Sequence, residues 1–148
     1  MNNNVIAMAG LMALGLLASE ASAAEHIINM LNKGADGKAM VFEPDFVRAA
    51  VGDTIKVVPV DKGHFAVPLP KVWPAGAAEV KGKMNAELVF TVDKEGTYGL
   101  KCTPHYAMGM VAMVQVGTAP VADDIKALKL PGEVGKRFAA QLEKAAAP

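Results

Sequence analysis

The sequence predicts an all-β domain, an antiparallel sandwich or barrel, that ends in two α-helices. Short runs of alternating apolar and polar residues, separated by Gly, Pro, Asn and Asp, recur as far as Gly117. Many short strands with frequent turns are typical of sandwiches and barrels. Beyond Gly117, apolar residues recur every three or four positions, which is the spacing of one helix face.

The strands are expected in six segments. They are residues 26–31, 39–42, 54–60, 86–92, 97–102 and 110–116. The third segment shows the pattern well, because Ile55 and Val57 alternate with polar neighbours. Residues 32–34 predict a turn after the first strand. Prolines at 68, 70 and 74 exclude a central strand or a long helix between His64 and residue 82.

Two helices are expected after the last strand. Val121, Ile125 and Leu128 have helical spacing, and acidic residues fall in the favourable first turn. A Pro-Gly pair at 131–132 separates a second helix, in which apolar residues recur every four positions from 134 to 142. We expect both helices to pack on the sandwich within a single domain.

The first residues have the pattern of a secretory signal peptide. Residues 5–17 are almost all apolar and are followed by small residues. The run is shorter than the roughly 20 residues that a membrane span needs. We predict a signal peptide over residues 1–23, cleaved after Ala23, and one domain over residues 24–148.

Composition narrows the function. Lys and Arg together number 15, as do Asp and Glu, so the net charge does not favour nucleic acid. No phosphate-binding glycine loop and no apolar run of spanning length are present. The chain has one cysteine, Cys102, whereas exported domains that use cysteine usually pair it. Either this thiol is buried and inert, or a ligand occupies it.

The segment after Cys102 favours a metal ligand. Cys102, His105 and Met110 supply a thiolate, an imidazole and a thioether at the spacing Cys-x2-His-x4-Met. Two imidazoles and one thiolate with a weak axial thioether form the blue-copper site. Of the three histidines, His26 lies close to the predicted amino terminus, so His64, after a turn, is the natural fourth ligand. His64, Cys102, His105 and Met110 are therefore the predicted metal residues.

Several segments resemble the pseudoazurins, a branch of the cupredoxin family. They are residues 30–34, 40–44, 59–64 and 101–110, the last reading Lys-Cys-Thr-Pro-His-Tyr-Ala-Met-Gly-Met. The two terminal helices also match, and the similar plastocyanins and amicyanins lack them. The resemblance implies an eight-stranded Greek-key β-sandwich and a periplasmic one-electron carrier with one type 1 copper. It implies the same four ligands, and it implies that Met40 lies over the exposed ligand His105.

Two positions depart from the family pattern. Phe65 follows the first ligand histidine, where the family usually has an Asn that ties two ligand loops together. Asn29 occupies a position where many relatives have a titrating histidine. We expect the first departure to affect the reduction potential and the second to remove a pH effect.

The expected activity is outer-sphere electron transfer through His105, without substrate turnover, by a monomer. The ring should emerge within an apolar patch formed by Met40, Pro59, Pro104, Ala107 and Met108. A rim of lysines is expected around it, comprising Lys33, Lys62, Lys81, Lys83 and Lys101. Such a rim attracts an acidic partner. The resemblance implies a copper nitrite reductase or a c-type cytochrome.

Three alternatives use the same residues. Cys102 is the nucleophile of a thiol enzyme in the first, with a histidine as base. The second is a copper chaperone or storage protein, although chaperones favour Met-rich or two-cysteine sites. The third is a structural zinc site, which would be colourless and redox-silent.

Overall fold

The computed structural model describes residues 22–148, and across them eight strands form two four-stranded sheets. The first sheet has the order β2-β1-β4-β6 and the second the order β3-β8-β7-β5. The strands of the first are β1 (Glu25–Lys33), β2 (Ala39–Glu43), β4 (Thr54–Pro59) and β6 (Leu88–Thr91). Those of the second are β3 (Phe46–Ala49), β5 (Ala66–Pro68), β7 (Gly96–Cys102) and β8 (Val111–Val116). The predicted Greek-key sandwich is confirmed; residues 1–21 of the predicted signal peptide lie outside the described residues.

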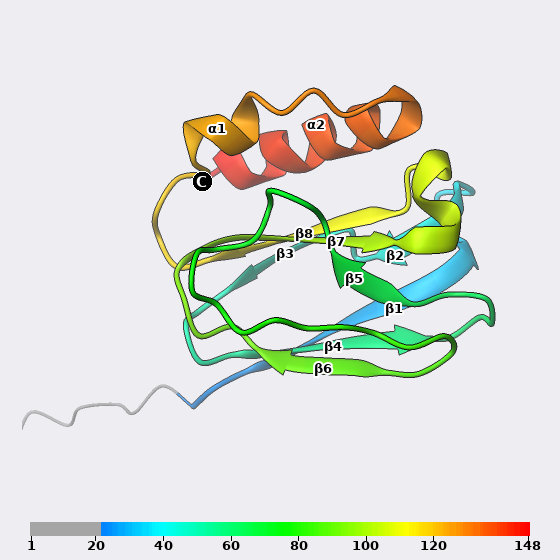
Figure 1. Cartoon of the computed structure of the whole chain (residues 1–148), viewed down its shortest axis with the longest axis horizontal. Helices are drawn as coiled ribbons and strands as arrows, with labels where there is room; N and C mark the ends of the chain where they lie inside the picture. Colours follow the sequence, from blue (N-terminus) through cyan, green and yellow to red (C-terminus); the bar gives the residue numbers. More distant parts are fainter. Residues whose placement is uncertain (1–21) are drawn as a thin grey trace, which may run out of the picture.

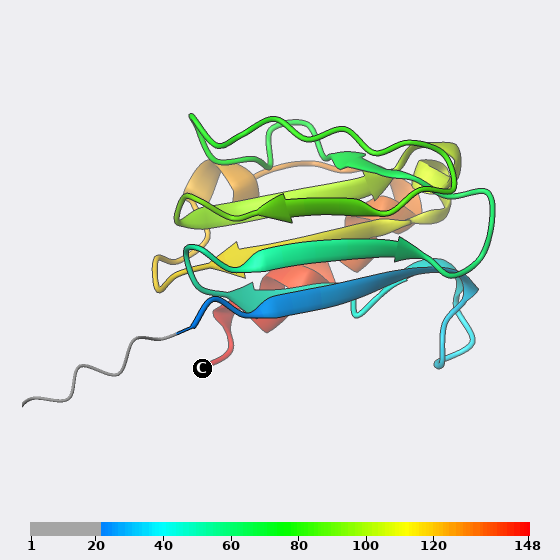
Figure 2. The same ribbon diagram turned by 90° about the horizontal axis from the view of Figure 1, so that it is seen from below.

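The helices form a third layer on the second sheet. They are η1 (Thr103–Met108), α1 (Asp123–Lys126) and α2 (Gly132–Ala146). Figure 1 shows α1 and α2 above β3, β7 and β8, with β1, β4 and β6 on the opposite side. Figure 2, seen from below, shows that β1, β4 and β6 run side by side across that lower face. Among the helices of residues 22–148, none has both the length and the hydropathy to cross a bilayer.

Two apolar clusters explain the layers. Alternate residues of β1 and β4, including Ile28, Met30 and Ile55, are fully buried between the sheets. A second cluster joins Val134 and Phe138 of α2 to apolar residues on the outer face of the second sheet. Every residue of β8 is buried, because this strand has the other sheet on one face and α2 on the other.

The sheets differ from the expectation in two respects. Pairs β1·β4 and β3·β8 are parallel, so the expectation of a wholly antiparallel sandwich is wrong for them. Strands β3 and β5 were also not predicted. Both are edge strands of three or four residues, too short to show a period. Pro68 at the end of β5 is tolerated because an edge strand needs no donor on its outer side.

Two boundaries also differ. Strand β1 continues to Lys33, so residues 32–33 lie in the strand rather than in the predicted turn. Helix α1 has four residues, fewer than the periodicity at 121–128 suggests. Pro131 follows a few residues after α1, and the residue before a proline disfavours helical backbone geometry, which limits how far this helix can extend. Helix α2 agrees with the prediction of a second helix after residues 131–132, and it is longer than α1.

Candidate metal centre

The segment between β7 and β8 forms a closed loop at one end of the sandwich. The Cys102 backbone N–H donates to the carbonyl of Met110 at 3.0 Å, and the Met110 backbone N–H donates to the carbonyl of His105 at 3.3 Å. Pro104 lies in the first turn of η1, where its missing N–H costs nothing. Gly109 ends the loop with φ of 87°, a conformation that glycine adopts without strain. These features fix the backbone that carries three of the four predicted ligands.

Three predicted donor atoms converge there. Cys102 Sγ lies 3.6 Å from His64 Nδ1 and 3.5 Å from His105 Nδ1, and the two Nδ1 atoms are 3.1 Å apart. His64, Cys102 and Met110 are fully buried, and His105 is partly exposed. Within residues 22–148, this trio of His and Cys is the cluster of potential metal ligands. His26 lies apart, with its Nε2 2.8 Å from Asp53.

Asn32 fixes the orientation of the His64 ring. His64 Nε2 lies 2.9 Å from Asn32 Oδ1. An amide oxygen only accepts, so Nε2 is the donor and the lone pair is on Nδ1, which faces Cys102. The backbone N–H of Asn32 in turn donates to Asp61 Oδ2 at 2.7 Å. A second hydrogen bond of this kind is typical of metal-binding histidines.

Asn85 holds the turn that carries His64. Its side-chain oxygen accepts from the backbone N–H of Gly63 at 2.6 Å, and its backbone N–H donates to the His64 carbonyl at 2.9 Å. Phe65, which departs from the family pattern, contributes to the centre through its backbone: a hydrogen bond from it lowers the pKa of the Cys102 thiol. This contact does not depend on the side chain at position 65.

Burial shifts the pKa values of two of these residues. Burial lowers the pKa of His64, and the neighbouring His105 lowers it further, so the imidazole stays neutral and able to bind a metal. Burial also raises the pKa of Cys102, against the opposing hydrogen bonds from the Phe65 and His105 backbone. A fully buried thiol with a raised pKa is a poor nucleophile. A bound cation would replace its proton.

The donor set fits copper. Two imidazole nitrogens and one sulfur within 4.8 Å of one another, with a buried methionine following in the same loop, are the ligands of a blue-copper site. The Asn32, Asp61 and Asn85 contacts were not predicted. Asn32 and Asp61 lie in segments of the family resemblance, but no local pattern connects either of them, or Asn85, with His64.

The family model described as copper binding proteins of the plastocyanin/azurin family matches residues 28–117, and the chain belongs to this family. Its relatives place it more narrowly. It is 48% identical to the pseudoazurin of Paracoccus pantotrophus over 131 residues, which are 88% of this chain and 90% of the relative. It therefore belongs to the pseudoazurins, which are electron-transfer proteins and not enzymes.

Solved structures agree. The crystal structure of native pseudoazurin from Hyphomicrobium denitrificans superposes with a TM-score of 0.77 at 50% identity, covering 81% of this chain and 97% of that one. The pseudoazurin of Methylobacterium extorquens has a TM-score of 0.74 at 41% identity, covering 81% of this chain and 98% of that one. The fold and the family were thus both predicted from the sequence.

Proposed function

We propose that the chain is a periplasmic carrier of single electrons that holds one type 1 copper through His64, Cys102, His105 and Met110. The convergence of His64 Nδ1, Cys102 Sγ and His105 Nδ1 within 4.8 Å carries the proposal. Copper, when bound, supplies the Cu(I)/Cu(II) couple. The protein holds the ligands in place: two loop hydrogen bonds, the Asn32 contact and complete burial of His64 keep them in one arrangement and exclude water.

His105 is the proposed contact for the redox partner, because its side chain is the partly exposed one of the four. Residues of the predicted apolar patch lie beside it in η1. Pro104 and Ala107 are exposed, and Met108 is 44% exposed. Met40 and Pro59, at the ends of neighbouring strands, are half-buried. A partly apolar surface of this kind suits a brief encounter.

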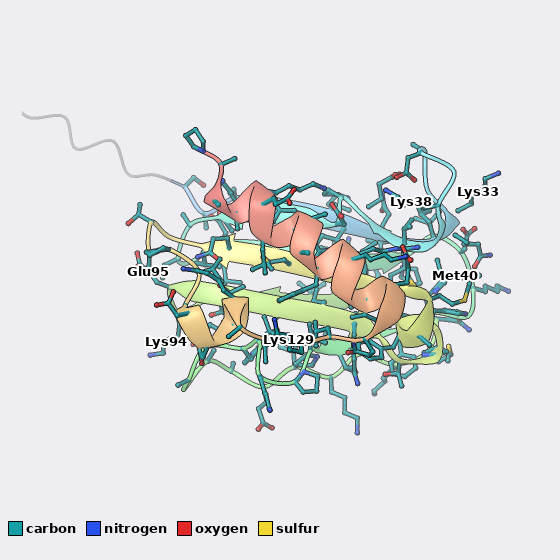
Figure 3. All side chains as sticks on the ribbon, turned by 90° about the horizontal axis from the view of Figure 1, so that it is seen from above. Lys33, Lys38, Met40, Lys94, Glu95 and Lys129 are labelled. Atoms are coloured by element: carbon teal, nitrogen blue, oxygen red, sulfur yellow. The ribbon has the colours of Figure 1, made fainter. Side chains whose placement is uncertain are left out.

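The proposed partner is an acidic redox protein, such as a copper nitrite reductase or a c-type cytochrome. Four of the five predicted rim lysines, Lys33, Lys62, Lys81 and Lys83, are exposed, and Lys101 lies with its Nζ 5.1 Å from the Tyr106 ring centre. Figure 3 shows Lys33 and Met40 at the same end of the molecule. Positive charge around an apolar contact accelerates association with an acidic partner, and this attraction weakens as the salt concentration rises.

Export is also proposed, with cleavage after Ala23. The Ala24 N–H donates to Asp53 Oδ1 at 2.8 Å and β1 begins at Glu25, so residues that belong to the sandwich follow the proposed cleavage site directly. Mass spectrometry of the protein from a periplasmic fraction tests this. A chain beginning at Ala24 is expected, and a full-length chain retained in the cytoplasm would contradict it.

A titration of the purified protein with Cu(II), followed by visible absorption, tests the copper proposal. We expect an intense thiolate-to-copper band that saturates at one equivalent, bleaches with ascorbate and returns with ferricyanide. Cys102→Ser is the control and should give no such band. A wild-type protein without the band, whose Cys102 still reacts with an alkylating reagent, would reject the proposal and favour the thiol enzyme.

The alternative of a copper chaperone or storage protein is tested by the rate of copper loss. Chaperones release Cu(I) readily, whereas the buried, hydrogen-bonded ligands here should release it slowly to a chelator. Complete transfer within the mixing time would favour the chaperone. A structural zinc site would give a colourless protein in which added Cu(II) produces no absorption band.

A further inference from the structure

Arg137 of α2 reaches the ligand end of the sandwich and binds the start of β2. Its Nη1 donates to the Met40 carbonyl at 2.8 Å, and its Nη2 donates to the Ala39 carbonyl at 3.0 Å. The side chain is only 15% exposed. A guanidinium presents its donors in one rigid plane, so it fixes both carbonyls at once.

The same side chain packs on the ligand loop at Gly109. A Cβ built on Gly109 would lie 2.8 Å from Arg137 Nε, and 2.9 Å from both Arg137 Cδ and Glu133 Cγ. The two α2 side chains therefore lie directly against the loop backbone, between His105 and Met110. Glu133 Oε1 lies 3.7 Å from Arg137 Nε, so the two side chains form an ion pair on the face of α2 that meets the loop.

The carbonyl that Arg137 binds belongs to a residue in an unusual conformation. Met40 has φ of 50°, which is uncommon for a residue with a side chain and persists where the surroundings enforce it. Met40 packs on the cluster that contains Cys102 and Met110, and β2 contacts η1. In Figure 3 Met40 lies at the ligand-loop end, beside the first turns of α2.

We propose that Arg137 is a positioning residue for the metal centre, which it controls through Gly109 and Met40; the proposal rests on the proposed copper site. Gln141, one turn further along α2, supports it, because its Nε2 donates to the carbonyl of Val111 at 2.9 Å, directly after Met110. The helix thus holds both the loop and the strand that follows it.

Arg137→Gln, Arg137→Lys and the matched control Arg48→Gln test the proposal. Arg48 also ties α2 to the sandwich, but at the other end, through the carbonyls of Lys144, Ala145 and Ala147. The first measurement is amide hydrogen exchange of residues 103–111 in the metal-free protein. Without its charged hydrogen bonds to Ala39 and Met40, the side chain at 137 no longer packs firmly on Gly109, so we expect exchange of residues 103–111 about tenfold faster in Arg137→Gln and unchanged in Arg48→Gln.

The second measurement is the visible and electron paramagnetic resonance spectra of the copper-loaded variants. Arg137→Gln should change the ratio of the absorption bands, Arg137→Lys should change it less, and Arg48→Gln should leave it as in wild type. Equal exchange and equal spectra in all variants would overturn the proposal, even if each one unfolds at a lower temperature. If the wild type gives no blue-copper spectrum, the copper proposal fails, and the metal-free exchange data still decide whether Arg137 orders the loop.

Discussion

At the residue scale, the hydrogen bond from His64 to Asn32 is predicted to increase the copper affinity. Asn32→Ala removes the acceptor 2.9 Å from Nε2 and frees the ring to rotate. Loss of such an outer contact typically lowers metal affinity about 10- to 100-fold. Competition with a chelator measures it. Asn29→Ala, three positions earlier in β1, is the control and should bind copper as wild type does; equal affinity in both variants would contradict a role for Asn32.

Met110 is predicted to tune the reduction potential rather than to retain the metal. A thioether is a weak axial donor, and an amide oxygen in its place stabilises Cu(II) more. Met110→Gln should therefore keep one copper per chain and have a lower potential in cyclic voltammetry. Met113 is fully buried beneath the helices and is not a suitable control position. Met84 is exposed, so Met84→Gln is the control and should leave the potential unchanged. An unchanged potential in Met110→Gln would reject Met110 as the axial ligand.

Much of the centre was predictable because three of its residues lie in one segment, 102–110. The spacing alone places Cys102 and Met110 at facing ends of adjacent strands. The contacts of Asn32 and Asn85 were not predictable, because they join positions 32 and 22 residues apart along the chain. Hydrogen bonds between distant loops leave no periodic pattern in the sequence.

At the scale of elements, α2 is predicted to contribute to stability through its apolar face. Phe138 is 2% exposed and packs with Val111 and Met113 of β8. Phe138→Ala should lower the free energy of unfolding by about 3 to 5 kcal/mol, the usual cost of truncating a buried aromatic residue. Chemical denaturation measures it. Lys136→Ala, whose side chain is 77% exposed on the same helix, should change stability little.

Asp53 joins the start of β1 to the turn before β4 and makes the fold sensitive to acid. Its carboxylate accepts from the Ala50 amide, from His26 and from the Ala24 amide, and these bonds lower its pKa from 3.8 to about 2. The unfolded chain therefore takes up the proton first. The stability from Asp53 is complete above about pH 4 and is lost as the pH falls through about 2.

Thermal unfolding between pH 2 and 6 tests this prediction. Asp53→Asn should unfold at a lower temperature at pH 6 and should lose less stability than wild type on acidification. Asp123→Asn is the control, since the pKa of Asp123 is lowered by the exposed Lys126 and such surface pairs contribute little. Parallel acid profiles for wild type and Asp53→Asn would contradict the role of Asp53.

The two strands that the sequence patterns missed are both short edge strands. Strands β3 and β5 lie at the edges of the second sheet, and each pairs on one side only. Their place is set by the neighbouring β8 and β7 rather than by their own alternation. The central strands and α2 were predictable because burial on a defined face imposes a period on them.

At the scale of the whole molecule, the charges at its two ends predict how a partner associates. Lys33 lies with Met40 at the ligand-loop end, and Lys94 lies at the opposite end (Figure 3). Both lysines are exposed. Two unit charges about 10 Å apart in water interact by about 0.4 kcal/mol, so reversing one charge changes the encounter energy by about 0.8 kcal/mol. Lys33→Glu should therefore slow association with an acidic partner about fourfold at low salt.

Stopped-flow electron transfer with an acidic c-type cytochrome, measured as a function of ionic strength, tests this last prediction. The wild-type rate should fall as salt rises, and the rates of wild type and Lys33→Glu should converge once the screening length, about 10 Å at 0.1 M, is shorter than the separation of the charges. Lys94→Glu makes the same change in net charge at the far end, so its rate should stay close to that of wild type. Equal slowing by both substitutions would mean that net charge, rather than a rim around His105, steers the partner, and would reject the proposed docking end.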